Sequence, residues 1–133
     1  MRIFLLLNTA LFLLFSACSK DSVTAENSDL VNVNSLEDFE NRTKTGASLV
    51  FFHATWCSLC ANQRPKVEAL LQDNDLDNVF FGQVDFEKNK PIVDAYNVNG
   101  FPTILILKDG VVRHALTGSN NSTAKLKELI QAL

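Results

Sequence analysis

The segment Trp56-Cys57-Ser58-Leu59-Cys60 constrains the fold of this chain more than any other part of its sequence. An apolar run, residues 49–54, precedes it, and a segment with helical spacing, residues 60–71, follows it. On a helix, residues i and i+3 share a face, so the two cysteines can reach the short Cα separation that a disulfide requires. At the first turn, free N–H groups and the helix dipole favour a thiolate at Cys57. We therefore predict a dithiol/disulfide pair in which Cys57 is the nucleophile and Cys60 the resolving thiol.

Length and charge limit the classes of protein that the chain can form. With 133 residues, 47% of them hydrophobic, it is long enough for one domain with a core and too short for two ordinary domains. The formal charge is −3 and there is no basic run. Binding of nucleic acid depends on clustered Lys and Arg, so we expect a single domain with no DNA or RNA partner.

The N-terminus has the pattern of a targeting segment. Arg2 is followed by an apolar stretch, residues 3–15, and then by Ser16, Ala17 and Cys18. This end resembles the lipobox of bacterial lipoproteins, although Phe15 stands where an aliphatic residue is usual. The resemblance implies that residues 1–17 are a signal peptide and that Cys18 carries lipid. An ordinary signal peptide that leaves Cys18 as a free thiol, and an uncleaved anchor, are the alternatives.

Each of the first two readings places the mature protein outside the cytoplasm. By the lipobox resemblance, it is held on a bacterial membrane and faces the periplasm. Residues 18–29 are polar and without periodicity, so we expect the lipidated Cys18 and a flexible tether there. The folded domain is expected over residues 30–133.

Strand and helix patterns alternate along this domain. A short strand is expected at residues 30–33, followed by a helix that Ser35 caps. Residues 49–54 read as a strand buried on both faces, and a helix containing Pro65 follows the cysteines. The remaining elements are a strand at 79–86, a helix opened by Pro91, strands at 103–107 and 111–116 joined by Asp109-Gly110, and a last helix capped by Asn121 or Ser122.

This order, with Cys-x-x-Cys after the second strand, resembles a thioredoxin-fold protein. The other markers are Pro65, eight positions after Cys57, the segment Gly100-Phe101-Pro102-Thr103, and Lys108-Asp109-Gly110. The resemblance implies an α/β fold in the order β-α-β-α-β-α-β-β-α. A central mixed sheet of about five strands would be flanked by about four helices.

The same resemblance implies roles for individual residues. Pro102 would be a cis proline that packs against the disulfide, and the backbone of Phe101 would pair with an extended substrate segment. Trp56, Phe101 and Pro102 would then bind the substrate. The implied activity is that of a thiol-disulfide oxidoreductase whose only redox group is the Cys57–Cys60 disulfide, with no other cofactor and no metal. Its partners would be proteins with disulfides or thiols and a membrane thiol-disulfide protein, and the chain would be a monomer.

The chain also departs from thioredoxin. Phe51 occupies the place of a buried Asp six positions before the first cysteine, and Phe81 the place of the Lys paired with it. His53 stands where thioredoxin has a Trp; it could relay a proton or, when charged, favour the Cys57 thiolate, or simply end the strand at the surface.

Ser58 and Leu59 do not strongly stabilise a thiolate, which favours an intermediate potential and a reductase over an oxidase. Two other functions remain open from the sequence. One is a non-catalytic binding or folding module with a structural Cys57–Cys60 disulfide. The other is metal carriage by Cys57, Cys60 and His53. Three ligands can suit an ion that is passed on, whereas a closed zinc site needs four.

Overall fold

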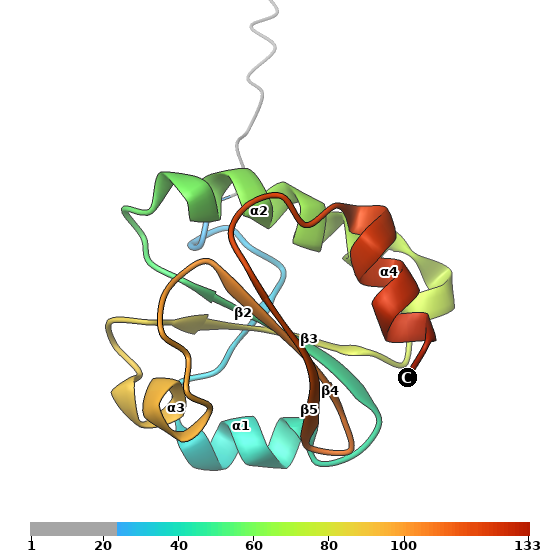
Figure 1. Cartoon of the computed structure of the whole chain (residues 1–133), viewed down its shortest axis with the longest axis horizontal. Helices are drawn as coiled ribbons and strands as arrows, with labels where there is room; N and C mark the ends of the chain where they lie inside the picture. Colours follow the sequence, from blue (N-terminus) through green and yellow to red (C-terminus); the bar gives the residue numbers. More distant parts are fainter. Residues whose placement is uncertain (1–23) are drawn as a thin grey trace, which may run out of the picture.

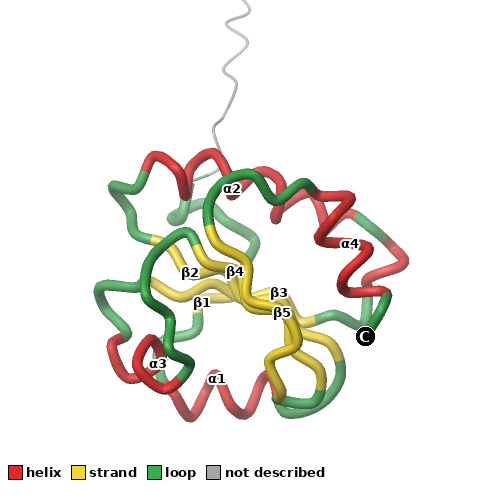
Figure 2. Tube along the Cα trace, in the orientation of Figure 1, coloured by secondary structure: helices red, strands yellow, loops and turns green. Residues whose placement is uncertain are grey.

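A five-stranded mixed sheet forms the centre of the domain. The computed structural model describes residues 24–133, so the predicted signal peptide, Cys18 and the first part of the tether lie outside the described residues. Figure 2 shows the strands together at the centre with the helices outside them. The strand order is β1-β3-β2-β4-β5. The strands are β1 (Val31–Asn32), β2 (Ala47–His53), β3 (Phe80–Asp85), β4 (Thr103–Lys108) and β5 (Val111–Thr117). β1, β3 and β2 are parallel, whereas β4 and β5 are each antiparallel to their neighbour.

Helices cover both faces of the sheet (Figure 1). One face carries α1 (Leu36–Thr43) and α3 (Lys90–Ala95), and the other carries α2 (Ser58–Glu68) and α4 (Thr123–Gln131). Two short 3-10 helices, Ala69–Gln72 and Asn74–Leu76, follow α2 in the chain. This architecture and order confirm the fold class predicted from the sequence. Within residues 24–133, none of the helices has the length and apolar content needed to cross a bilayer.

Strand β2 joins the two cores. Because successive side chains of a strand point to opposite faces, Leu49 and Phe51 pack towards α2 and α4 while Val50 and Phe52 pack towards α1 and α3. All four side chains are 0% exposed. The prediction of a central strand buried on both faces is therefore confirmed, and its carboxyl end points at the cysteine motif.

Local signals define where the helices and the hairpin begin. Ser35 Oγ accepts a hydrogen bond from the backbone N–H of Asp38 at 3.1 Å and so caps α1. Ser122 Oγ caps α4 in the same way, accepting from the N–H of Lys125 at 3.2 Å. Of the two predicted cap residues, Asn121 and Ser122, the cap is therefore Ser122. In the β4–β5 turn, Asp109 and Gly110 have φ values of 49° and 78°, as a tight hairpin of this kind requires.

The helix after the cysteine motif differs from the predicted one. It begins at the cysteines, as predicted, but the helical spacing predicts that it continues to residue 71, whereas α2 spans Ser58–Glu68 and the chain then tightens into the 3-10 helix Ala69–Gln72. Pro65 lies inside α2, where its lack of an N–H leaves the carbonyl of Ala61 without its usual donor.

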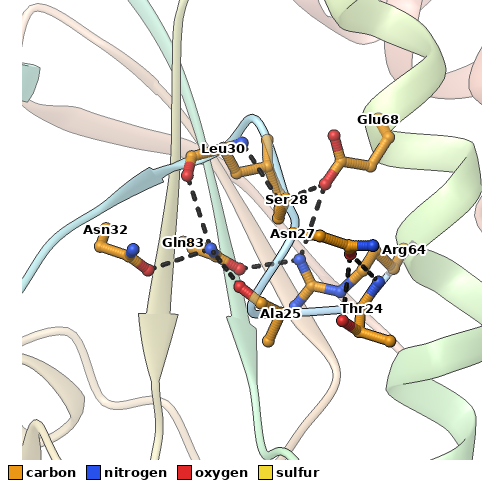
Figure 3. Close-up of polar contacts among 9 residues, drawn as sticks. All are labelled: Thr24, Ala25, Asn27, Ser28, Leu30, Asn32, Arg64, Glu68 and Gln83. Carbon is orange, nitrogen blue, oxygen red and sulfur yellow. Dashed lines mark hydrogen bonds and ion pairs between the residues drawn. The ribbon is translucent and has the colours of Figure 1, made fainter.

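The last residues of the expected tether lie against the domain. Gln83 is buried in the middle of β3, and its Nε2 donates to the carbonyl oxygen of Ala25 at 3.3 Å (Figure 3). Ser28 Oγ donates to a carboxylate oxygen of Glu68 on α2. A buried amide needs acceptors, and this segment supplies one of them. Contacts with the domain thus begin before Leu30, the residue at which the sequence placed its boundary.

Candidate active site

The two cysteines of the motif form a disulfide at the start of α2. Their Cα atoms are 5.2 Å apart. Cys57 is the N-cap residue of the helix, and its Sγ accepts a hydrogen bond from the backbone N–H of Cys60 at 3.1 Å. Cys57 is 9% exposed and Cys60 2%. Of the two sulfur-bearing residues, Cys57 is therefore the more accessible and the one beside the positive end of the helix dipole.

Three aromatic side chains lie beside the motif. Trp56 is 68% exposed, and the centre of its ring is 5.3 Å from that of Phe101 in an edge-to-face contact. The ring of Phe86 lies 4.8 Å from Phe101 on the other side. Trp56 Nε1 donates to a carboxylate oxygen of Glu87 at 3.0 Å, which holds the indole in place. The sequence indicated Trp56 and Phe101 but not Phe86 and Glu87, which follow β3 without any motif.

The loop before β4 carries the predicted proline. The Phe101–Pro102 peptide bond is cis, which confirms that prediction. Thr103 Oγ1 donates to the carbonyl oxygen of Gly100 at 2.8 Å and closes the turn. This loop borders a groove of about 340 Å³ between residues 96–103 and strand β5.

His53, the last residue of β2, is a buried side chain. It is only 4% exposed, and its ring lies nearly parallel to that of Phe51, with centroids 5.9 Å apart. Its Nδ1 is buried without a hydrogen-bond partner among residues 24–133. Burial, followed by the positive charge of Arg64, lowers the pKa of His53 to about 4. The imidazole is therefore neutral at pH 7. Two of the predictions for His53 are wrong: it does not end the strand at the surface, and it does not favour the Cys57 thiolate as a charged ring.

A cavity of about 190 Å³ lies between His53 and the disulfide. It is lined by Thr24, Ala25, His53, Ala54, Thr55, Cys57, Cys60, Ala61, Arg64 and Pro65. Arg64 is 3% exposed, an unusual position for a guanidinium. Sequence reasoning missed this residue. The spacing could have indicated it: Arg64 follows Cys60 by four positions, so the two side chains lie on the same face of one helix.

The described residues contain no group of three or more His, Cys, Asp and Glu side chains placed to hold a metal ion. The structure thus brings Cys57, Cys60 and His53 to one cavity, and Trp56 to Phe101 beside the disulfide. Cys18 lies outside the described residues.

A disulfide at a helix start, next to a cis-proline loop on a mixed sheet of this order, defines a thiol-disulfide oxidoreductase of the thioredoxin fold. The chain belongs to the thioredoxin family, since residues 30–132 match the Thioredoxin family model.

Individual relatives agree with this assignment. The chain is 33% identical to the thioredoxin of Echinococcus granulosus over 81 residues, which cover 61% of this chain and 72% of that protein. It is 33% identical over 103 residues to a protein disulfide-isomerase of Schizosaccharomyces pombe, covering 75% of this chain but only 27% of the isomerase. Among solved structures, the thioredoxin of Fasciola hepatica superimposes with a TM-score of 0.67 at 33% identity, covering 77% of this chain and 98% of that one.

Proposed function

We propose that this protein is a membrane-tethered, extracytoplasmic reductase of protein disulfides. The observation that carries the proposal is the Cys57–Cys60 disulfide at the start of α2, with the more accessible sulfur at the N-cap and exposed Trp56 beside it. A helix N-terminus stabilises the thiolate that must attack a substrate disulfide. Exposed aromatic surface gives such a site apolar area with which to hold a protein substrate.

The reaction is a pair of thiol-disulfide exchanges. The Cys57 thiolate attacks one sulfur of the substrate disulfide, forms a mixed disulfide and releases the other substrate sulfur as a thiolate. The Cys60 thiolate then attacks Cys57 Sγ, which closes the Cys57–Cys60 disulfide and releases the second substrate sulfur. Two electrons pass to the substrate, and its two thiolates take up protons. A membrane thiol-disulfide protein would return the pair to the dithiol, and no other cofactor is needed.

The substrate contacts proposed for this site are Trp56, the backbone of Phe101, and Pro102. Edge-to-face packing of Trp56 on Phe101 supports the idea that both side chains present one surface. An extended substrate segment pairing with the backbone of Phe101 would bring its disulfide alongside Cys57. The reducing direction is favoured because neither Ser58 nor Leu59 adds a charged side chain that would strongly favour the thiolate.

Insulin reduction tests the activity. The wild-type protein should turn over insulin disulfides in the presence of a chemical reductant, and Cys57→Ser should remove that turnover. Equal rates for the two proteins would refute the proposal. The reduction potential should lie between about −270 and −120 mV, the range from thioredoxin to a strong oxidant. A potential below about −300 mV would instead favour a structural disulfide in a binding module.

The tether is tested separately from the chemistry. The leader and Cys18 suggest lipidation, so a bacterial host expressing the full chain should incorporate a labelled fatty acid into the wild-type protein. Cys18→Ser should lose the label and leave the membrane fraction. Its insulin turnover after extraction should be unchanged, because Cys18 takes no part in the proposed exchange. Retention of the label in Cys18→Ser would refute lipidation at this residue.

A further inference from the structure

The resolving cysteine, Cys60, is one of the residues that line the cavity next to His53. None of the described residues that line the cavity next to Cys60 is an Asp or a Glu. The side chain of Phe51, which is fully buried, belongs to the same core as Cys60. A thiol in apolar surroundings holds its proton more tightly, and it must lose that proton before it can attack. No carboxylate among the lining residues is therefore placed to take that proton, so the Cys60 thiolate must be favoured in another way.

Arg64 is the cation that faces this cavity. It lies one helical turn after Cys60 on α2 and lines the same cavity. Its guanidinium carbon is 5.0 Å from the centre of the Phe51 ring, so the phenyl face supports the cation. An arginine stays protonated even in such a buried place.

Two side chains, one on β3 and one on α2, hold this guanidinium (Figure 3). Its Nη1 donates to Gln83 Oε1 at 2.7 Å and lies 3.7 Å from a carboxylate oxygen of Glu68. The Gln83 amide is itself oriented, because Nε2 donates to the carbonyl oxygen of Ala25, 3.3 Å away, and to Asn32 Oδ1, 3.0 Å away. The amide oxygen is thereby left pointing at Arg64, which keeps the cation beside the cavity.

His53 cannot replace a missing base here. With a pKa of about 4, its imidazole would accept a proton from a thiol of ordinary pKa, about 8.5, at a disadvantage of about four orders of magnitude. The proton of Cys60 must therefore leave to solvent, and a nearby positive charge is what makes that loss easier.

We propose that Arg64 is a positioning residue for the second exchange, stabilising the Cys60 thiolate by its charge while Phe51 and Gln83 fix the guanidinium at the cavity. In that step Cys60 first loses its proton to solvent, and the thiolate then attacks Cys57 Sγ of the mixed disulfide. The Cys57–Cys60 bond forms, the bond from Cys57 to the substrate breaks, and the substrate sulfur leaves with the electron pair. The inference rests on the proposed exchange at these two cysteines.

The test measures ionisation of Cys60 rather than turnover. In the full chain carrying Cys57→Ser, the rate of iodoacetamide labelling of the Cys60 peptide is followed against pH by mass spectrometry. Arg64 on α2 and His53 on β2 line the cavity itself, and Glu68 is paired with Arg64. The charged residues of the adjoining pocket, which His53 also lines, are Glu26, Asp85 and Lys88. The midpoint of the profile reports their combined effect, and slow access to a buried sulfur does not move it.

When Arg64→Gln is introduced into the Cys57→Ser protein, the midpoint of the Cys60 labelling profile should rise by about one pH unit. Labelling at pH 7 should then slow about tenfold. Glu68→Gln removes the anion that offsets Arg64 and should shift the midpoint the other way, with labelling about two- to threefold faster. Lys88→Gln removes an equal charge from a side chain that is 77% exposed and should leave the midpoint in place.

Opposite shifts in Arg64→Gln and Glu68→Gln are a result that loosened packing cannot produce, because disruption would move both variants in one direction. Arg64→Lys, which keeps the charge, should restore most of the wild-type midpoint. Equal midpoints in the Cys57→Ser parent and in its Arg64→Gln and Glu68→Gln variants, or a shift of the same sign for these two variants, would overturn the inference. Insulin turnover by the wild-type protein is a separate measurement, so failure of the reductase proposal would be recognised independently.

Discussion

Protonation of His53 should make the stability of the protein depend on pH in a defined window. In the unfolded chain a histidine binds its proton near pH 6.5, whereas in the folded protein burial lowers the pKa of His53 to about 4. Between these two values the unfolded chain binds more protons, so acid favours unfolding. The contribution of His53 to stability is complete above pH 6.5 and is lost as the pH falls towards 4.

The magnitude follows from the change in pKa. The pKa falls from 6.5 to about 4, and each pKa unit corresponds to about 1.4 kcal/mol. Lowering the pH from 7 to about 4 therefore removes about 3 kcal/mol of stability. For a domain of ordinary stability, about 5–15 kcal/mol, this is a large fraction.

Urea unfolding of the oxidised protein at pH 7, 6, 5 and 4 measures this loss, with the midpoint and the m-value recorded at each pH. Carboxylates also titrate towards pH 4, so the informative quantity is the difference from a matched variant. His53→Gln keeps a neutral polar side chain but has no group that protonates. It should lose about 3 kcal/mol less than the wild type over this range. Parallel pH profiles for the two proteins would refute the reasoning.

Three further predictions concern the substrate surface, the hairpin and the core. Trp56→Ala should lower kcat/KM for insulin about tenfold but leave the rate with a small aromatic disulfide nearly unchanged, since only a protein substrate needs the exposed ring; equal losses would contradict this. Gly110→Ala should destabilise the protein by about 1 kcal/mol in thermal melts because φ is 78° there, whereas Gly100→Ala, with open space around it, should be neutral. Phe39→Ala should remove about 3–5 kcal/mol in urea titrations, because the ring is fully buried and packs on Phe52 and Tyr96; a loss below 1 kcal/mol would contradict that packing.

Most of the architecture followed from patterns within short stretches of sequence. Ser35 and Asp109-Gly110 act through their own neighbours, as a helix cap and a hairpin turn, so their effects can be read without knowing the fold. The continuous apolar run of β2 likewise predicts a strand with both faces covered. The contacts before Leu30 were harder to predict, because the carbonyl of Ala25 and the hydroxyl of Ser28 meet Gln83 and Glu68 only in the folded chain.

The cysteine pair illustrates the same division at the active site. The sequence by itself determined that Cys57 and Cys60 can bond and that Cys57 begins a helix, because both properties depend on spacing along one segment. Only the tertiary structure decided the surroundings of that pair. Arg64, Phe51 and Gln83 come from different elements and meet in the folded protein, where each alters the electrostatic environment of the others. The ionisation of a buried group depends on which charges and how much solvent the fold brings to it, and no local pattern carries that information.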